Sequence, residues 1–279
     1  MNIKLSEQQI ASFDRDGLLL VYQLIDPFLA DEIAERYHYL FRGEFETGVQ
    51  PDEINWQEGE SAEEFTRQIC NGWKADRTLA SVVLREDIGK VGVKLARWPG
   101  ARVMQDNVIW ESIGPRPLDF HQDNSYLDWF TPSETLTCWI SLDDTTAEGG
   151  TMEVVRGSHR WGKFPMATQF HGPEAYRQDM EVAAKALGKS PEIIPIVVPK
   201  GGGSFHHGWT WHGSGFNKSE NPRRSLVIHM CSSEARFQKE TLVVATGVFT
   251  LAITDCQMIL WTKTTFQYCG PKTGDALHL

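Results

Sequence analysis

The sequence predicts a mainly β fold with flanking helices, in which short strands form a sandwich or barrel. Helical patterns dominate up to Ala101, where the texture changes to β-rich runs divided by Gly and Pro turns. Such runs occupy residues 102–110, 117–123, 134–142, 151–155, 192–198, 203–207 and 223–230. No Pro, Gly or Ser linker divides the chain, so we expect residues 1–279 to form one domain, with about residues 1–100 as a helical segment that braces a sheet from outside.

The first predicted elements are a short helix and a strand. Ser6 and Gln9 have the spacing of a capping box, in which each side chain bonds the backbone N–H of the other at a helix start. We expect this helix to end near Gly17. The run at 17–24 is short and apolar, as in a buried strand.

Further helical patterns flank an acidic segment. Asp26 and Pro27 are typical of a helix N-cap and first helical position, and this helix is predicted to continue to about Phe41. We expect the acidic span 43–75 to be an irregular, solvated surface segment of the kind that forms part of a lid. Residues 75–97 return to helical spacing and predict a helix that packs on a sheet.

Composition limits the classes of partner. The chain has 279 residues, a formal net charge of −10 and a sequence pI of about 5.4. Nucleic acids and anionic membranes attract basic surfaces, so neither is an expected partner. The longest apolar stretch, 242–253, is shorter than the roughly 20 residues that span a bilayer, and no signal peptide pattern is evident. We therefore expect a cytoplasmic monomer or homodimer.

Cysteine usage agrees with a reducing compartment. The five cysteines are odd in number and form no Cys-x-x-Cys pair, so neither a disulfide framework nor a zinc knuckle is indicated. Cys138 lies in an apolar strand pattern and is expected to be a core residue.

The stretch 118–130 carries the main chemical signal, the triplet His121, Gln122 and Asp123. Alternate side chains of an extended strand share a face, so His121 and Asp123 are expected to point to one place while Gln122 points away. An imidazole and a carboxylate are two ligands of a facial triad, in which two histidines and one carboxylate bind iron and leave three positions open. The triplet therefore predicts part of a catalytic metal site.

The third ligand of such a site has to be a distant histidine. Three candidates lie within residues 204–230, namely His206, His207 and His212. Strand parity does not choose among them, because the position of a bend around Gly208 is not given by the sequence. The remaining histidines are expected to be hydrogen-bonded structural residues; they are His38, His159, His171, His229 and His278.

Three stretches carry a resemblance to a known family. They are HQD at 121–123, SLDDTTAEGGTMEVVRGSHRWG at 141–162 and WHGSGFNKSENPRR at 211–224. They resemble the phytanoyl-CoA dioxygenase family of iron(II)- and 2-oxoglutarate-dependent oxygenases, and the likeness runs from the segment 5–26 to at least His229. It implies a double-stranded β-helix, which is a jelly roll with a cupin-like core. It also implies Fe(II), 2-oxoglutarate as cosubstrate and O2, and six-coordinate iron suits a bidentate keto acid better than zinc does.

The resemblance assigns site residues. His212 stands in the family's W-H-x-S-G sequence and would be the third metal ligand beside the triplet. Arg223, eleven residues later, would bind the C5 carboxylate of 2-oxoglutarate, because guanidinium matches carboxylate with two parallel donors. Arg224 would then face outward. Ser214 would add a hydroxyl to the same carboxylate, and Trp139 would line the pocket or serve as a plain core residue.

Two positions depart from the family pattern. Many members have a cosubstrate-binding lysine in the strand before the metal motif, where this chain offers Glu111. Gln105 or Asn107 would supply neutral donors in its place, and Gln105 is the predicted contact. Arg156 replaces a usual proline in a turn, where only a structural effect is expected.

The resemblance implies a reaction class. Oxidative decarboxylation of 2-oxoglutarate to succinate and CO2 would be coupled to hydroxylation of an unactivated C–H bond. Related halogenases have Ala or Gly in place of Asp123, so the carboxylate favours hydroxylation, or desaturation or ring formation. Two alternatives stay open: a jelly-roll metal dioxygenase that does not use 2-oxoglutarate, and a small-molecule binding module without activity.

The predicted substrate contacts follow the metal motif and are Gln122, Tyr126, Trp129 and Phe130. The aromatic run favours a small, partly apolar molecule, although loop aromatics packed on the sheet edge are an equal alternative. No clear basic cluster is present to bind the phosphates of a coenzyme A thioester, so we expect a free small molecule.

Overall fold

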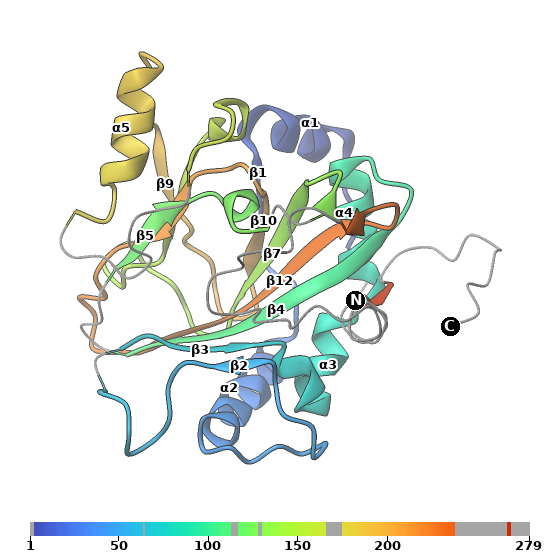
Figure 1. The fold of residues 1–279 in the computed structure, drawn as a ribbon, viewed down its shortest axis with the longest axis vertical. Coiled ribbons are helices and arrows are strands. Elements are labelled where there is room, and N and C mark those ends of the chain that lie inside the picture. The colour runs from blue at the N-terminus through green and yellow to red at the C-terminus, as the bar shows by residue number, and fades with distance from the viewer. Residues whose placement is uncertain are drawn as a thin grey trace.

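A computed structural model describes residues 3–63, 65–112, 117–127, 130–165 and 175–237, together with the backbone of a short strand at 267–268. In these residues two antiparallel sheets pack against each other (Figure 1). Apolar side chains of both sheets meet between them, among them Trp139 and Val227 of the larger sheet and Val154 of the smaller one. This arrangement is the predicted jelly roll.

The larger sheet has eight strands in the order β1-β10-β7-β12-β4-β3-β2, with β14 also paired to β4. Its strands are β1 (Leu18–Val21), β2 (Glu53–Ile54), β3 (Arg67–Cys70), β4 (Ala101–Glu111), β7 (Thr135–Ser141), β10 (Gly203–His207), β12 (Arg223–Ser232) and β14 (Gln267–Tyr268). Strands β4 and β12 are the longest of this sheet and run side by side along their length in Figure 1.

The smaller sheet has four strands in the order β5-β11-β8-β9. They are β5 (Leu118–His121), β11 (His212–Ser214), β8 (Met152–Val155) and β9 (Ile193–Pro195), and a separate pair is formed by β6 (Phe130–Thr131) and β13 (Arg236–Phe237). The predicted β runs all contain strands. Strand β11, which carries one candidate metal ligand, was not predicted as a separate element.

Four helices cover the outer face of the larger sheet, as predicted for the N-terminal segment. They are α1 (Glu7–Asp16), α2 (Pro27–Phe41), α3 (Arg77–Val83) and α4 (Glu86–Ala96), and their apolar faces share one core with β4, β7 and β12. The capping box at Ser6 and Gln9 and the Asp26 cap are both present. A further helix, α5 (Gln178–Ala186), which was not predicted, packs on the smaller sheet through Met180 and Ala183.

Strand alternation decides which side chains of the larger sheet face the smaller one. On β4, Val108 and Trp110 lie in the core beneath the helices. Neighbouring side chains of a strand point to opposite faces, so Asn107, Ile109 and Glu111 face the space between the sheets. The face of β4 toward the smaller sheet thus carries the buried polar side chains of Asn107 and Glu111.

Two predictions about the N-terminal region are wrong in part. Residues 75–97 form two helices rather than one, because Arg85 is extended and its guanidinium bonds the carbonyl of Leu24 (2.8 Å) and the carboxylate of Asp87 (2.9 Å). The acidic span 43–75 is not wholly irregular, since β3 pairs with β4 and extends the sheet. Both differences come from contacts with distant parts of the chain.

Other predictions concern thiols and membranes. Cys70, Cys138 and Cys231 are buried free thiols, and Cys138 lies in the core as predicted. Among the described residues, no helix combines the length and apolarity needed to cross a membrane. The apolar stretch 242–253, and also His171, Cys256, Cys269 and His278, lie outside the described residues.

Candidate active site

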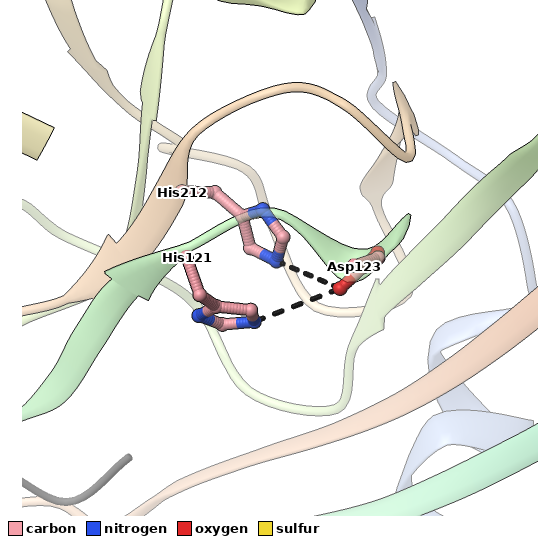
Figure 2. Close-up of side chains that lie close together, drawn as sticks. All are labelled: His121, Asp123 and His212. Atoms are coloured by element: carbon pink, nitrogen blue, oxygen red, sulfur yellow. Dashed lines mark ion pairs between the residues drawn. The ribbon is translucent and has the colours of Figure 1, made fainter. Parts of the chain in front are cut away.

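Three predicted ligands meet at one edge of the smaller sheet. His121 ends β5, Gln122 stays extended, and Asp123 begins a 3-10 helix (Asp123–Ser125). The extended backbone at Gln122 preserves the predicted alternation, so His121 and Asp123 point to the same place. His212, the first residue of β11, is the direct cross-strand partner of His121. Figure 2 shows both imidazoles directed at the Asp123 carboxylate.

The geometry suits one bound metal ion. Nε2 of His121 lies 3.6 Å and Nε2 of His212 3.4 Å from the same Oδ1 atom of Asp123, and the three candidate ligand atoms lie within 4.8 Å of one another. Each Nδ1 faces a backbone carbonyl, that of Asp119 for His121 (2.8 Å) and that of Thr210 for His212 (2.9 Å). A proton on Nδ1 directs the lone pair of Nε2 toward a metal ion.

The charges of the three ligands are coupled. Burial alone would raise the pKa of Asp123, but the charges of His212 and His229 and its hydrogen bonds hold this pKa well below its usual range. Burial and the charge of His212 lower the pKa of His121. Burial opposes protonation of His212 as well, yet the Asp123 carboxylate raises its pKa. A bound cation would take the place of that proton and balance the buried carboxylate.

A second set of polar side chains holds the other oxygen of Asp123. Thr137 donates to Oδ2 (2.6 Å), and Nε2 of His206 lies 3.3 Å from the same atom. Nδ1 of His229 lies 2.9 Å from the Thr137 hydroxyl, and its Nε2 lies 3.1 Å from the Asn107 amide. Because these residues come from β7, β10, β12 and β4, they tie the metal motif of the smaller sheet to the larger sheet.

Most of this supporting set is not evident from the sequence. Thr137 stands two residues before Trp139, so strand parity already places the two on one face. His229 was expected to be a hydrogen-bonded structural residue, which it is. His206 was one candidate for the third ligand, and the structure instead places it behind Asp123.

His207 points away from the metal motif. Its Nδ1 accepts a hydrogen bond from the backbone N–H of Trp209 (3.1 Å), and its ring lies 5.5 Å from that of His159. Burial lowers the pKa of His207 to about 4. Among the three candidates, His212 is the one whose ligand atom groups with those of His121 and Asp123, whereas His206 contacts the other carboxylate oxygen of Asp123.

The predicted cosubstrate residues Arg223 and Ser214 also meet, but around a third residue. Arg223 and Glu111 are cross-strand partners on β12 and β4, and both are buried. Nε of Arg223 donates to Oε2 of Glu111 (2.8 Å), and Nη2 forms an ion pair with the same oxygen. The Ser214 hydroxyl donates to Oε1 (3.1 Å), and Nη1 of Arg223 donates to the carbonyl of Gly149 (2.9 Å). The donors predicted for a cosubstrate carboxylate thus hold the carboxylate of Glu111.

The other residues predicted around the cosubstrate have different outcomes. Arg224 lies on the opposite face of β12 from Arg223, as expected, and pairs with Asp143 (2.6 Å), but its side chain is only 20% exposed and is not a surface charge. Trp139 packs between the sheets beside Val227, which is compatible with either predicted role. Gln105 does not join Arg223, because its amide donates to Asn107 (2.9 Å) in the polar set behind Asp123.

The predicted substrate contacts lie in different surroundings. Gln122 is 1% exposed; its amide donates to the carbonyls of Gly162 (3.0 Å) and Trp209 (2.8 Å) and accepts from Phe164 N–H (3.0 Å). These bonds use its polar atoms and argue against a substrate contact.

The aromatic contacts are closer to the metal motif. Tyr126 packs edge-on against His121, with ring centroids 5.8 Å apart. Phe130 is buried in a cluster with Met104 and Cys231, against which Tyr126 also packs. Trp129 lies outside the described residues.

A jelly roll whose smaller sheet directs two histidines and one aspartate at one point presents the ligand set of a facial-triad metal site. Comparison with known families agrees: the model described as phytanoyl-CoA dioxygenase (PhyH) matches residues 13–225. The chain belongs to this family. The predicted cofactors, iron with 2-oxoglutarate and O2, are thereby confirmed at the level of the family.

Individual relatives are distant. The human peroxisomal phytanoyl-CoA dioxygenase is 27% identical over 127 residues, which cover 42% of this chain and 34% of the human protein. The match therefore spans about a third of that relative's length.

Solved structures share the fold. The non-heme α-ketoglutarate-dependent epimerase SnoN of nogalamycin biosynthesis, solved with Fe3+, α-ketoglutarate and nogalamycin RO, has a TM-score of 0.68 at 19% identity, with 96% of both chains covered. The carbocyclase SnoK has a TM-score of 0.65 at 20% identity, with 84% of this chain and 87% of SnoK covered. At these identities the likeness concerns the fold alone.

Proposed function

We propose that this protein is an iron(II)- and 2-oxoglutarate-dependent oxygenase that hydroxylates an unactivated C–H bond of a small, partly apolar molecule. The observation that carries the proposal is the buried cluster of His121, Asp123 and His212, whose ligand atoms converge from one side. Family membership supports the same class of reaction.

The ligands would hold iron(II), which supplies oxygen activation together with the keto acid when both are bound. The carbonyls of Asp119 and Thr210 orient the two imidazoles, so metal binding needs no change of rotamer. Thr137 occupies Oδ2 of Asp123 and leaves Oδ1 for the ion. Each ligand is about 5% exposed, which limits the access of water to the site.

The surroundings support the substrate class. The ring of Tyr126 stands beside His121, and the apolar cluster of Phe130 continues from it, so a partly apolar molecule would find contacts next to the metal. A carboxylate at position 123 keeps a third protein ligand and favours hydroxylation. SnoN and SnoK are an epimerase and a carbocyclase, so other outcomes are known on this fold.

An anaerobic optical titration tests the proposal. Purified metal-free protein would receive Fe(II) and then 2-oxoglutarate, and we expect a visible metal-to-ligand charge-transfer band only when both are present. His212→Ala should give no band because the third ligand is missing, whereas His207→Ala should behave as the unchanged protein does. Iron binding without a band at any 2-oxoglutarate concentration would contradict the use of this keto acid.

A second candidate is a metal dioxygenase that acts on its bound substrate without a keto acid. The pairing of Arg223 with Glu111 favours it, because the guanidinium expected to bind the cosubstrate already has a carboxylate partner. Oxygen consumption with substrate and Fe(II) but no added keto acid would support this second candidate.

A further inference from the structure

Glu111 stands where an acidic ligand of Arg223 would be expected. Its two carboxylate oxygens receive Nε of Arg223 at one and the Ser214 hydroxyl at the other, and the remaining Nη1 is used by the carbonyl of Gly149. Both side chains are 7% exposed. The Nε and Nη2 atoms of Arg223 thus both face the carboxylate of Glu111, a residue of the same chain.

The charges of Arg223 and Glu111 restrict which ligands can bind to the guanidinium. Arg223 and Glu111 form a neutral buried pair, and a second carboxylate entering the same place would put two anions against one cation in a region of low dielectric constant. A buried carboxylate without its own partner is strongly disfavoured. A ligand with a distal carboxylate can therefore use Arg223 only if Glu111 leaves, whereas a ligand with an uncharged end does not compete for the guanidinium.

We propose that Glu111 is a specificity-determining residue of the cosubstrate site, one that occupies Arg223 and Ser214 in place of the distal carboxylate of a 2-oxo acid. The inference rests on the proposed function. It has two consequences: 2-oxoglutarate binds with an affinity reduced by the need to displace Glu111, and the protein discriminates weakly between 2-oxoglutarate and an uncharged-ended 2-oxo acid of the same length.

The test compares two keto acids of five carbons, 2-oxoglutarate and 2-oxopentanoate. Their dissociation constants would be measured under anaerobic conditions on the Fe(II)-loaded protein by calorimetry and by the charge-transfer band, so no turnover is required. We expect the unchanged protein to prefer 2-oxoglutarate by less than ten-fold. Glu111→Gln keeps the size of the side chain but removes its charge, and it should raise this preference at least ten-fold by tightening 2-oxoglutarate alone.

Two variants serve as controls. Glu111→Asp keeps the charge and should keep the preference near that of the unchanged protein. Asp143→Asn neutralises the carboxylate that pairs with Arg224 on the opposite face of β12 from Arg223, and should leave both affinities unchanged. Thermal unfolding of each Fe(II)-loaded variant establishes that it is folded before binding is measured.

The outcomes separate the two proposals. A preference above a hundred-fold in the unchanged protein, or no increase in Glu111→Gln, overturns the role of Glu111 and leaves the proposed function standing. If Fe(II) binds but neither keto acid binds to either protein, both proposals fall. If Glu111→Gln does not fold, the preference of the unchanged protein alone decides.

Discussion

At the scale of single residues, Asp123 has two oxygens with different tasks. Oδ1 faces Nε2 of both His121 and His212, whereas Oδ2 is held by Thr137 and lies close to His206. A ligand whose second oxygen is fixed by hydrogen bonds loses little freedom when a metal binds to the first, so we expect the supporting residues to affect metal affinity without being ligands.

His212→Ala should abolish stoichiometric iron binding, because two of three protein ligands cannot hold the ion against buffer and gel filtration. His207→Ala is the matched control, since this neighbouring histidine bonds to Trp209 and not to the metal motif. Iron per protein after gel filtration is the measurement. If the His212→Ala variant retained one equivalent of iron, His212 would not be a metal ligand.

Thr137→Val should weaken Fe(II) binding by about 10–100-fold while the fold is retained, because the change removes the hydroxyl that donates to Asp123 but preserves side-chain volume. Competition with a chelator of known affinity would measure the effect. Ser141→Ala is a suitable control on the same strand, because its hydroxyl bonds to the carbonyl of Asp143 instead. Equal affinities of the two variants would contradict a role for Thr137 in orienting the carboxylate.

At the scale of elements, the end of α1 joins the helical layer to the larger sheet. Gly17 ends this helix with φ of 68°, and its carbonyl accepts hydrogen bonds from the backbone N–H of His207 (3.0 Å) and the hydroxyl of Thr210 (3.1 Å). The conformation and the close packing both require glycine. A helix cap that is local in sequence thereby positions the segment between β10 and β11.

Gly17→Ala should lower the free energy of unfolding by about 2–4 kcal/mol, since a Cβ would have left-handed backbone strain and would lie 2.4 Å from Nδ1 of His159 and 2.7 Å from Oγ1 of Thr210. Gly188→Ala is the control, because Gly188 also has a positive φ after a helix, at α5, but a Cβ there meets nothing within 4 Å. Its cost should be about 1 kcal/mol. Urea unfolding of both variants measures the difference, and equal costs would exclude the steric contribution.

At the scale of the whole molecule, the site is built where two sheets meet, and several buried histidines lie there. Burial lowers the pKa values of His121 and His229, and it lowers those of His206 and His207 to about 4. Only His212, which faces Asp123, has a raised pKa among these. Most of these rings are therefore neutral in the fold.

The metal-free protein should lose stability as the pH falls from about 6.5 toward 4. In this window the unfolded chain takes up protons on histidines whose folded pKa is lowered, so unfolding is favoured, and His207 ceases to contribute below about 4, where both states are protonated. Urea unfolding across this range measures the effect.

His207→Gln isolates one of these groups. Between about pH 6.5 and 4, the free energy of unfolding of this variant should change less steeply with pH. The slope should fall by up to about 1.4 kcal/mol per pH unit, which corresponds to the uptake of one proton. An unchanged slope would show that His207 does not titrate differently in the two states.

Features of this protein that have a local or periodic cause were predictable from its sequence. Helix caps at Ser6 and Asp26 depend on residues within a turn of each other, and the shared direction of His121 and Asp123 follows from strand alternation. The resemblance to the family pointed to His212 and Arg223, and the structure places His212 beside His121 and Asp123 and Arg223 beside Glu111.

The contacts that these residues make depend on the tertiary structure. The partner of Arg223 is Glu111, 112 positions earlier, and the supports of Asp123 come from four strands of the other sheet. The break at Arg85 and the pairing of β3 likewise depend on distant contacts. Hydrogen bonds and ion pairs act over about 3 Å in space, and only sheet register brings together such residues from strands that are far apart in the chain.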